Sequence, residues 1–449
     1  MNQARRVVRI LPLSLGDKDL EHARARMAAA VELLAGQADF AETVALRKQD
    51  AYYLLPAAAE DFDAIALSTP LAVPAFSTHI AALGKPVLLL EPTCGFHPYQ
   101  ATARAGLEHA GAAVLPTDSP AAIRSSVRAL QAANGIRGSR VLLFVADVNK
   151  DAALALRAEE KLGVAVSILP VDELKDEARR VPETAASAVL TDWKSRIFSS
   201  ITGVSDAHLI EVARLYLAER KFIERSGAAA LGVEEFDPFL HQGLPMPNVT
   251  YTVLKAEGIV CTEEADLGCL LTQVLLCRST GEQNTMSNIY TEYRAEFERL
   301  ASPNDYTAEM EFTDYEECLA DNCLVVSHFS TAGSLPQNMM VEDKPEIRST
   351  GSSWRGQSMA YATPRIGPVT LARLDDALEQ LQAFPGSVAD VRKFDHLGWY
   401  RCRWLVRVHS VRAFVERAIH HHFAITPGHP DATLHTLAEK LLRIRLSLH

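Results

Sequence analysis

Short apolar runs alternate with stretches of helical periodicity through the first third of the chain, and this alternation strongly constrains the fold. The first run, VVRILPLSL (7–15), precedes an amphipathic stretch at 19–36 that ends at Gly36, and a glycine in that place is a helix stop signal. Further apolar runs lie at 42–48, 64–69, 86–92 and 112–117. Because strands that alternate with helices form a parallel sheet with crossover helices, the pattern predicts an α/β domain over residues 1–130.

The same pattern restarts near residue 130. The run RVLLFVAD (140–147) is typical of a buried strand, and another strand is expected at 164–171. Apolar residues at helical spacing predict a long helix over 206–227, whereas the Pro- and Gly-rich stretch 236–251 is expected to be a loop. We therefore expect a second α/β domain over residues 131–290.

The final third has a different pattern. Runs that are typical of strands, with few helices between them, lie at 322–333, 358–364, 368–374 and 400–409. They predict a β-rich, barrel-like domain over residues 291–449. The expected fold class is thus α/β, with two N-terminal doubly wound parallel-sheet domains followed by a β-rich C-terminal domain. The length of 449 residues is too great for one hydrophobic core, which favours several domains.

Charge and composition argue against several classes of partner. The net charge is −11 and the basic residues are dispersed, so we expect no nucleic acid. No apolar run approaches the roughly 20 residues that a membrane span needs, so we expect no membrane contact. Seven cysteines without a C-x-x-C pair predict neither a disulfide framework nor a zinc ribbon, and a reducing cytoplasm fits best.

Common cofactor and catalytic fingerprints do not occur in the sequence. There is no G-x-G-x-x-G after a strand, no phosphate-binding P-loop, no H-E-x-x-H and no G-x-S-x-G. Any chemistry must therefore come from residues that are scattered along the chain.

The stretch CTEEADLGCLLT (261–272) places Glu263, Glu264 and Asp266 directly before a long apolar helix. Carboxylates in the first turn of a helix are favoured by its dipole, so capping explains part of this charge. Three carboxylates between two cysteines exceed what a cap needs, and a cation site is the second interpretation.

Two further segments carry polar groups near expected strands. TMSNIYTEY (285–293) contains Ser287 and Asn288, which belong either to a plain turn or to a ligand set. LVVSHFSTAG (324–333) contains His328, which is either a hydrogen-bonded core group or a ligand.

The segment AIHHHFAITPGH (418–429) contains three consecutive histidines before an apolar run. It is either an exposed polar stretch or the source of one metal-binding imidazole. If the segment is a strand, His420 and His422 share one face and His421 lies on the other. Carboxylate, amide and imidazole ligands together suit Mn²⁺ or Mg²⁺ better than Zn²⁺ or copper.

In this order, the four segments resemble the L-fucose/L-arabinose isomerase superfamily, and GPVTLARL (367–374) resembles a run of its C-terminal domain. The resemblance implies that Glu264 is the metal-binding catalytic glutamate, and that Asp266 is the aspartate that follows it. It assigns His422 as the metal histidine and His328 as a ligand or a substrate contact.

The resemblance departs from the family at the second metal carboxylate. That position falls on Asn288, or on Ser287 if the alignment shifts by one. An amide oxygen can still coordinate a hard cation, although without charge. Glu263 and Glu292 are candidates to replace the missing carboxylate.

The resemblance implies an aldose–ketose isomerase that converts its sugar through an ene-diol and uses Mn²⁺ or Mg²⁺ as its cofactor. Glu264 and Asn288 would be catalytic, and both would hold the metal with His422 and His328. A related metal enzyme acting on a sugar acid or polyol, and a sugar-binding relative without catalysis, are the alternatives.

The resemblance also implies a homo-oligomer, a trimer or hexamer, in which a neighbouring N-terminal domain completes each site. His97, in the segment 91–100, is the candidate for that contribution, and an ordinary loop is the alternative. Trp354 and Arg355 are candidate sugar contacts, because an aromatic face suits sugar C–H groups and Arg suits an anionic group. A surface loop is the alternative for these two residues.

Overall fold

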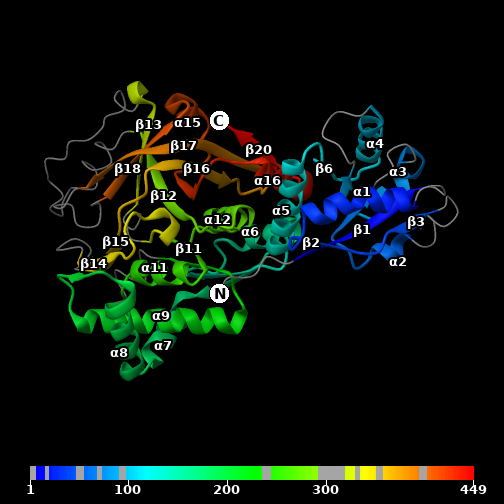
Figure 1. Cartoon of the computed structure of the whole chain (residues 1–449). Coiled ribbons are helices and arrows are strands. Elements are labelled where there is room, and N and C mark those ends of the chain that lie inside the picture. The colour runs from blue at the N-terminus through cyan, green and yellow to red at the C-terminus, as the bar shows by residue number, and fades with distance from the viewer. Residues whose placement is uncertain are drawn as a thin grey trace.

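The protein is described here by a computed structural model in which two parallel sheets and a β-barrel follow one another along the chain (Figure 1). The structure describes residues 7–15, 20–46, 55–67, 73–90, 98–234, 244–291, 319–328, 334–349, 357–393 and 402–449.

The first sheet is parallel throughout and has the strand order β2-β1-β4-β5-β6, with β3 also paired to β1. Its strands are β1 (Val8–Leu15), β2 (Ala38–Phe40), β3 (Val44–Leu46), β4 (Ala64–Leu67), β5 (Val87–Leu89) and β6 (Val114–Leu115). Its helices are α1 (Leu20–Leu33), α2 (Leu55–Ala59), α3 (Val73–Ala81), α4 (Pro98–His109) and α5 (Pro120–Ile136). The predicted strands are confirmed.

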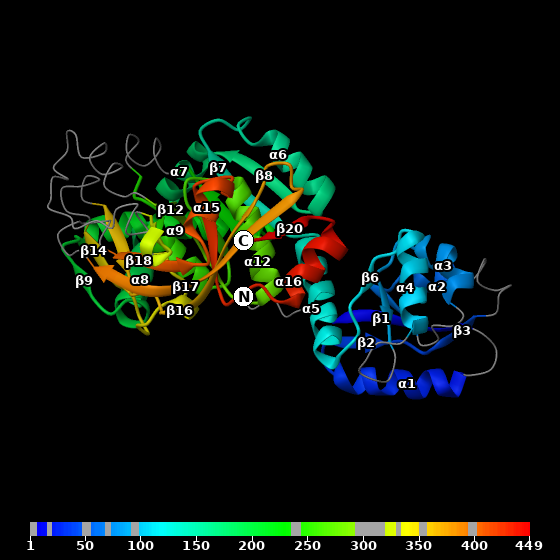
Figure 2. The same ribbon diagram turned by 90° about the horizontal axis from the view of Figure 1, so that it is seen from above.

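Helices cover both faces of this first sheet, as Figure 2 shows. Alternate strand residues such as Ile10 pack with α1 and α5, whereas Leu11 and its equivalents pack with α2, α3 and α4. The sheet is therefore doubly wound. The predicted domain boundaries at residues 130 and 290 stay predictions.

The second sheet has the order β8-β7-β10-β11 and is also parallel. Its strands are β7 (Arg140–Val145), β8 (Ala165–Pro170), β10 (Ala230–Val233) and β11 (Val260–Thr262). The helices around it are α6 (Ala152–Arg157), α7 (Val171–Arg180), α8 (Glu183–Asp192), α9 (Asp206–Ser226), α11 (Asn248–Ala256) and α12 (Leu267–Thr280). One face of the sheet packs on α7, α9 and α11, and the other packs on α5, α6 and α12.

Local signals explain where the long helices begin and end. Ser205 caps α9 by accepting a hydrogen bond from the backbone N–H of His208, and Gly227 ends it with a φ of 66°. The prediction of a loop over 236–251 is wrong at its C-terminal end, because α11 begins at Asn248. Pro247 stands just before this helix, where a missing N–H costs nothing.

Six antiparallel strands close into a barrel in the order β16-β19-β12-β13-β18-β17, with β17 paired back to β16. The strands are β12 (Thr285–Tyr290), β13 (Cys323–Ser327), β16 (Gly367–Leu374), β17 (Gln380–Lys393), β18 (Cys402–Val408) and β19 (His422–Pro427). Phe384, Trp404 and Phe423 fill the interior with aliphatic side chains. The barrel is therefore a packed core, as expected for so few strands.

Other strands and helices of the last third lie around the barrel. They are β20 (Arg445–Leu448), which adds to β17 in parallel, α15 (Val411–Arg417) and α16 (Ala432–His435). Strand β15 (Ser358–Tyr361) is not part of the barrel but pairs with β14 (Glu346–Ser349), which pairs in turn with β9 (Ile201–Thr202). Among the described residues, no helix combines the length and apolar character that crossing a membrane requires.

Helix α12 connects the second sheet with the barrel. It follows β11 and packs against the outside of β16 and β19. On β19, Phe423 points into the barrel, so the alternating positions His422 and Ala424 point out towards α12. The carboxylates before α12 and the polar side chains on the outer wall of the barrel thereby face one another.

Candidate metal centre

The turn between β11 and α12 has an unusual backbone. Glu264 and Ala265 have φ values of 57° and 52°, although neither is glycine. Two consecutive left-handed residues cost free energy and persist where the surroundings over-determine them, often at functional sites. The turn ends at Asp266, whose side chain caps α12 by accepting from the backbone N–H of Cys269 at 2.8 Å. The capping interpretation is confirmed for Asp266. Capping does not account for Glu264.

Glu264 lies between two imidazoles that come from the barrel. Its Oε1 is 3.1 Å from His328 Nε2 and its Oε2 is 3.3 Å from His422 Nε2. Burial alone would raise the pKa of Glu264, but hydrogen bonds from the two histidines outweigh it and lower the pKa far below its usual range. The Glu264 side chain keeps 19% of its surface exposed, more than the side chains of Glu263 at 2% and Asp266 at 10%.

His328 follows β13 and is fully buried, at the end of a series of polar side chains that contact one another in turn. Its Nδ1 is 2.6 Å from Glu263 Oε2, and Glu263 Oε1 accepts from the Ser334 hydroxyl at 2.7 Å. Lys255 Nζ donates to the Ser334 hydroxyl at 3.2 Å and to the Ser334 carbonyl at 2.6 Å. Burial opposes a charge on His328, but Glu263 and Glu264 outweigh it and raise the pKa of His328 to about 10.

An imidazole between two carboxylates carries a proton on each nitrogen and so offers no lone pair to a metal. His328 is therefore placed to donate to Glu264, and it becomes a ligand only if Nε2 loses its proton. Glu263, a candidate for the missing carboxylate, faces His328 and Ser334. Glu292 lies outside the described residues.

His422 is oriented by a buried ion pair. Its Nδ1 is 2.9 Å from Asp266 Oδ2, and Arg373 Nη1 donates to both oxygens of Asp266 at 2.8 and 2.7 Å. Burial lowers the pKa of His422, but hydrogen bonds to Asp266 and Glu264 outweigh it and raise that pKa. A carboxylate on Nδ1 fixes a ring so that Nε2 points to a ligand site, which is the usual support of a metal-binding histidine.

Asn288 lies directly opposite His422 in the β12–β19 pair, so their Cβ atoms are about 5 Å apart. Its amide nitrogen donates to the Tyr290 hydroxyl at 2.9 Å. Its Oδ1 is buried and has no hydrogen-bond partner among the described residues. A buried oxygen without a donor is costly, and a cation beside His422 would satisfy it.

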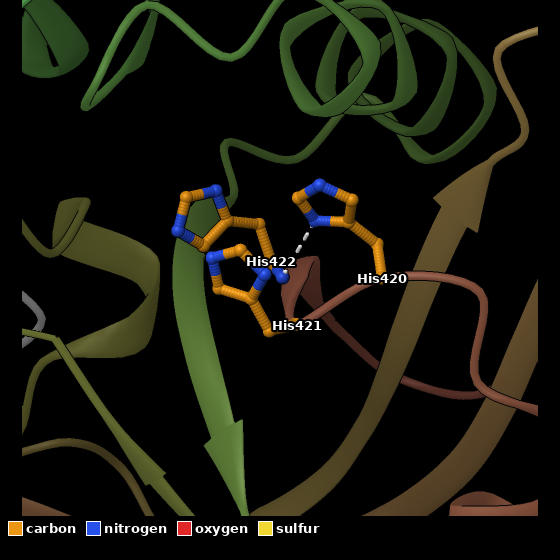
Figure 3. Close-up of side chains that lie close together, drawn as sticks. All are labelled: His420, His421 and His422. Atoms are coloured by element: carbon orange, nitrogen blue, oxygen red, sulfur yellow. Dashed lines mark hydrogen bonds between the residues drawn. The ribbon is translucent and has the colours of Figure 1, made fainter. Parts of the chain in front are cut away.

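Two more histidines adjoin the centre. His420 and His421 precede β19, so the expected alternation does not apply to them and all three rings gather on one side (Figure 3). Burial and the charge of Arg373 lower the pKa of His420 to about 4.

The structure brings together Glu264, His328 and His422, whose ligand atoms all lie within 4.8 Å of one another. It places Asn288 beside them through its strand pairing with His422. The remaining candidates, His97, Trp354 and Arg355, lie outside the described residues.

Sequence reasoning did not find the supporting roles of Arg373, Ser334 and Lys255. Arg373 belongs to the segment GPVTLARL, where a charged residue within an apolar run was the available signal. Ser334 and Lys255 carried no local signal.

Comparisons with known proteins do not assign the chain to a family. No protein-family model matches it, and no curated protein matches it. One solved structure described as a two-component system response regulator/GGDEF domain protein aligns with 14% identity and a TM-score of 0.24. The alignment covers 60% of this chain and 96% of the other. A likeness at this TM-score carries no argument about fold or function.

Proposed function

We propose that the chain is a metal-dependent aldose–ketose isomerase that acts on an open-chain sugar. The convergence of Glu264, His328 and His422 supports the proposal. Carboxylate and imidazole donors, with the unpartnered amide oxygen of Asn288 beside them, fit Mn²⁺ or Mg²⁺. Glu264, His422 and Asn288 would hold the ion. His328 would become a further ligand only by giving up its Nε2 proton, and with it the donation to Glu264.

The proposed reaction moves a proton between two neighbouring carbons of the sugar. A bound divalent cation would polarise the carbonyl and offset the charge of the enediolate. Glu264 is the part-exposed carboxylate of the group, so we assign it to accept a proton from the substrate and return it, although the two histidines lower its pKa and so weaken it as a base. His328, held protonated beside Glu263, donates to Glu264 and controls how strongly that carboxylate attracts a proton.

Mn²⁺ binding to metal-stripped protein tests the site directly. We expect calorimetry to show binding by the wild type, and a loss of at least about 100-fold in affinity for Glu264→Gln and for His422→Ala, because each removes a ligand rather than an outer partner. Glu159→Gln and His435→Ala change exposed residues of the same types and should bind like the wild type. A wild type that binds neither Mn²⁺ nor Mg²⁺ would overturn the proposal.

A panel of aldoses and ketoses, followed by detection of the interconverted sugar, tests the reaction. We expect His328→Gln to lower kcat by a larger factor than it lowers Mn²⁺ affinity, because His328 contacts Glu264 as a donor. Equal losses in both quantities would instead make His328 an ordinary ligand.

A related metal enzyme that acts on a sugar acid or polyol is the second candidate, and Asn288 is the observation that favours it. An amide in place of a carboxylate lowers the negative charge of the site, which suits an anionic substrate. Turnover of sugar acids or polyols without turnover of any aldose would select this candidate. Metal binding without turnover of either panel would select a sugar-binding relative.

We also propose that the chain forms a trimer or hexamer in which a neighbouring subunit completes each site. Light scattering on the purified chain measures the mass of the assembly. A monomer that turns over sugar at full rate would contradict this part of the proposal.

A further inference from the structure

His420, His421 and His422 form a second group that could hold a metal ion, with ligand atoms within 4.8 Å of one another. The ring centroids of His420 and His421 are 4.5 Å apart at an interplanar angle of 17°, and those of His421 and His422 are 4.0 Å apart. Figure 3 shows the three rings on the same side of the chain. Two nitrogens on a tetrahedral zinc lie about 3.3 Å apart, so small side-chain rotations would complete the site.

The backbone holds this arrangement in place. His422 N–H donates to His420 Nδ1 at 3.0 Å, which leaves Nε2 of His420 for a ligand. The carbonyl of His421 accepts from Ile289 N–H at 3.1 Å, so the segment is attached to β12. Exposure decreases from His421, which is exposed, through His420 at 34% to His422 at 5%. The group therefore leads from solvent to the buried centre.

The donor chemistry of the two groups differs. The outer group offers three imidazoles, and the nearest carboxylate oxygen to His420 Nδ1, on Asp266, is 3.8 Å away. Imidazole donors favour Zn²⁺, Co²⁺, Ni²⁺ and Cu²⁺, whereas oxygen donors favour Mn²⁺ and Mg²⁺. The inner group contains Glu264 and adjoins Asn288, so its preference is for the harder ions.

Both groups need the same atom. His422 Nδ1 is committed to Asp266, so Nε2 is the nitrogen left for a metal. In the present arrangement Nε2 faces Glu264 at 3.3 Å. An ion held by His420 and His421 can use this nitrogen only when no inner ion uses it.

We propose that His420, His421 and His422 form an outer site for a borderline-soft divalent cation such as Zn²⁺, and that its occupation excludes Mn²⁺ from the inner centre. The exclusion rests on the proposed inner centre, whereas the outer site does not. In functional terms, the outer site makes the enzyme sensitive to inhibition by Zn²⁺.

The test measures Zn²⁺ and Mn²⁺ affinities separately on metal-stripped full-length protein, with Co²⁺ absorption as a readout of imidazole coordination. The variants are His421→Asn, His420→Asn combined with His421→Asn, and Glu264→Gln. Asn at position 420 retains an acceptor for His422 N–H. His435→Asn serves as the control, because His435 is an exposed histidine paired with Glu439 away from the group.

We expect the double variant to lose Zn²⁺ affinity by more than about 10–100-fold, while its Mn²⁺ affinity stays unchanged. A loss of only about 10–100-fold is typical when a residue that merely supports a ligand is removed. Glu264→Gln should show the reverse, and Zn²⁺ should displace Mn²⁺ from the wild type. Unchanged Zn²⁺ affinity in the double variant would overturn the outer site. Simultaneous binding of both ions by the wild type would overturn the exclusion. Zn²⁺ binding that depends on His420 and His421, in a protein that binds no Mn²⁺, would support the outer site and refute the proposed isomerase.

Discussion

Replacing Asp266 by Asn removes one charge from a buried network and leaves its shape almost unchanged. Asp266 caps α12, accepts from Arg373 with both oxygens, and holds His422 Nδ1. Asn caps a helix about as well as Asp, so the capping contribution should survive. What the variant loses is the charge that balances Arg373 and one of the two acceptor oxygens, because an amide NH2 donates and cannot accept.

The size of the loss follows from burial. The Arg373 side chain is 3% exposed and that of Asp266 is 10% exposed, so solvent cannot replace the missing carboxylate. Removing one partner of a buried ion pair costs about 3–5 kcal/mol, because the other charge stays buried without compensation. We expect a loss of this size in the free energy of opening α12 and β16.

Native-state amide hydrogen exchange is the appropriate assay, because it reports local opening free energies in a large chain without assuming a single unfolding step. Asp431→Asn is the matched control. Asp431 also caps a helix, α16, by accepting from the backbone N–H groups of Thr433 and Leu434, but it is exposed. We expect this control to cost less than about 0.5 kcal/mol.

The pH dependence gives a second check. Burial would raise the pKa of Asp266, but His422 and Arg373 outweigh it and lower that pKa far below its usual range. A lowered folded-state pKa gives stability that is present above the unfolded value of about 3.9 and is lost on acidification below it. The difference between wild type and Asp266→Asn should therefore shrink below about pH 4. A difference from the control of less than about 1 kcal/mol at pH 7 would refute the ion-pair reasoning.

Three further predictions concern burial, packing and metal binding. Burial raises the pKa of Glu219 to about 8, so the folded state keeps a proton that the unfolded state loses, and stability should fall as pH rises from about 4 to 8. Glu219→Gln should remove this pH dependence and be more stable than the wild type at pH 8 by a few kcal/mol. Unfolding midpoints measured against pH test this prediction, and parallel curves for the two proteins would contradict it. A Cβ on Gly268 would lie 2.7 Å from Arg373 Nη2, so Gly268→Ala should displace the guanidinium. We expect calorimetry to show a loss of about 10–100-fold in Mn²⁺ affinity. If the variant binds Mn²⁺ as tightly as the wild type, Arg373 does not support the site. Mn²⁺ at about 100 times the wild-type Kd should stabilise the wild type by about 2.7 kcal/mol and Glu264→Gln by at most about 0.4 kcal/mol, given its loss of at least about 100-fold in affinity. Thermal unfolding with and without the ion measures this, and equal shifts in both proteins would place the ion elsewhere.

The fold was predictable where local signals repeat. Strand β1 lies at Val8–Leu15 within the predicted 7–15, and α9 ends at Gly227 as expected. These features depend on hydrophobic periodicity and capping, which a few neighbouring residues encode. Pairing between distant strands is not encoded in this way. Strand β15 was expected in the barrel, but it pairs with β14, which pairs in turn with the distant β9 outside the barrel.

The candidate site was predictable in its chemical groups but not in its connections. Carboxylates before a helix and histidines beside strands are visible in the sequence, and Glu264, His328 and His422 do meet. Arg373 is 107 residues from Asp266 in the sequence, and only the contact of β16 with α12 brings them together. The alternation considered for His420 and His421 holds only within a strand, and β19 begins directly after them at His422.

The candidate centre draws its groups from two separately built parts of the molecule. Glu264 comes from the edge of a parallel sheet, whereas both imidazoles come from the closed barrel, whose filled interior leaves its strands little room to shift. A cation bound there would be coordinated by both parts and would link the sheet to the barrel. The affinity for that cation would then depend on how the sheet and the barrel are placed relative to one another, so a substitution in the α12 interface that shifts one against the other would change it.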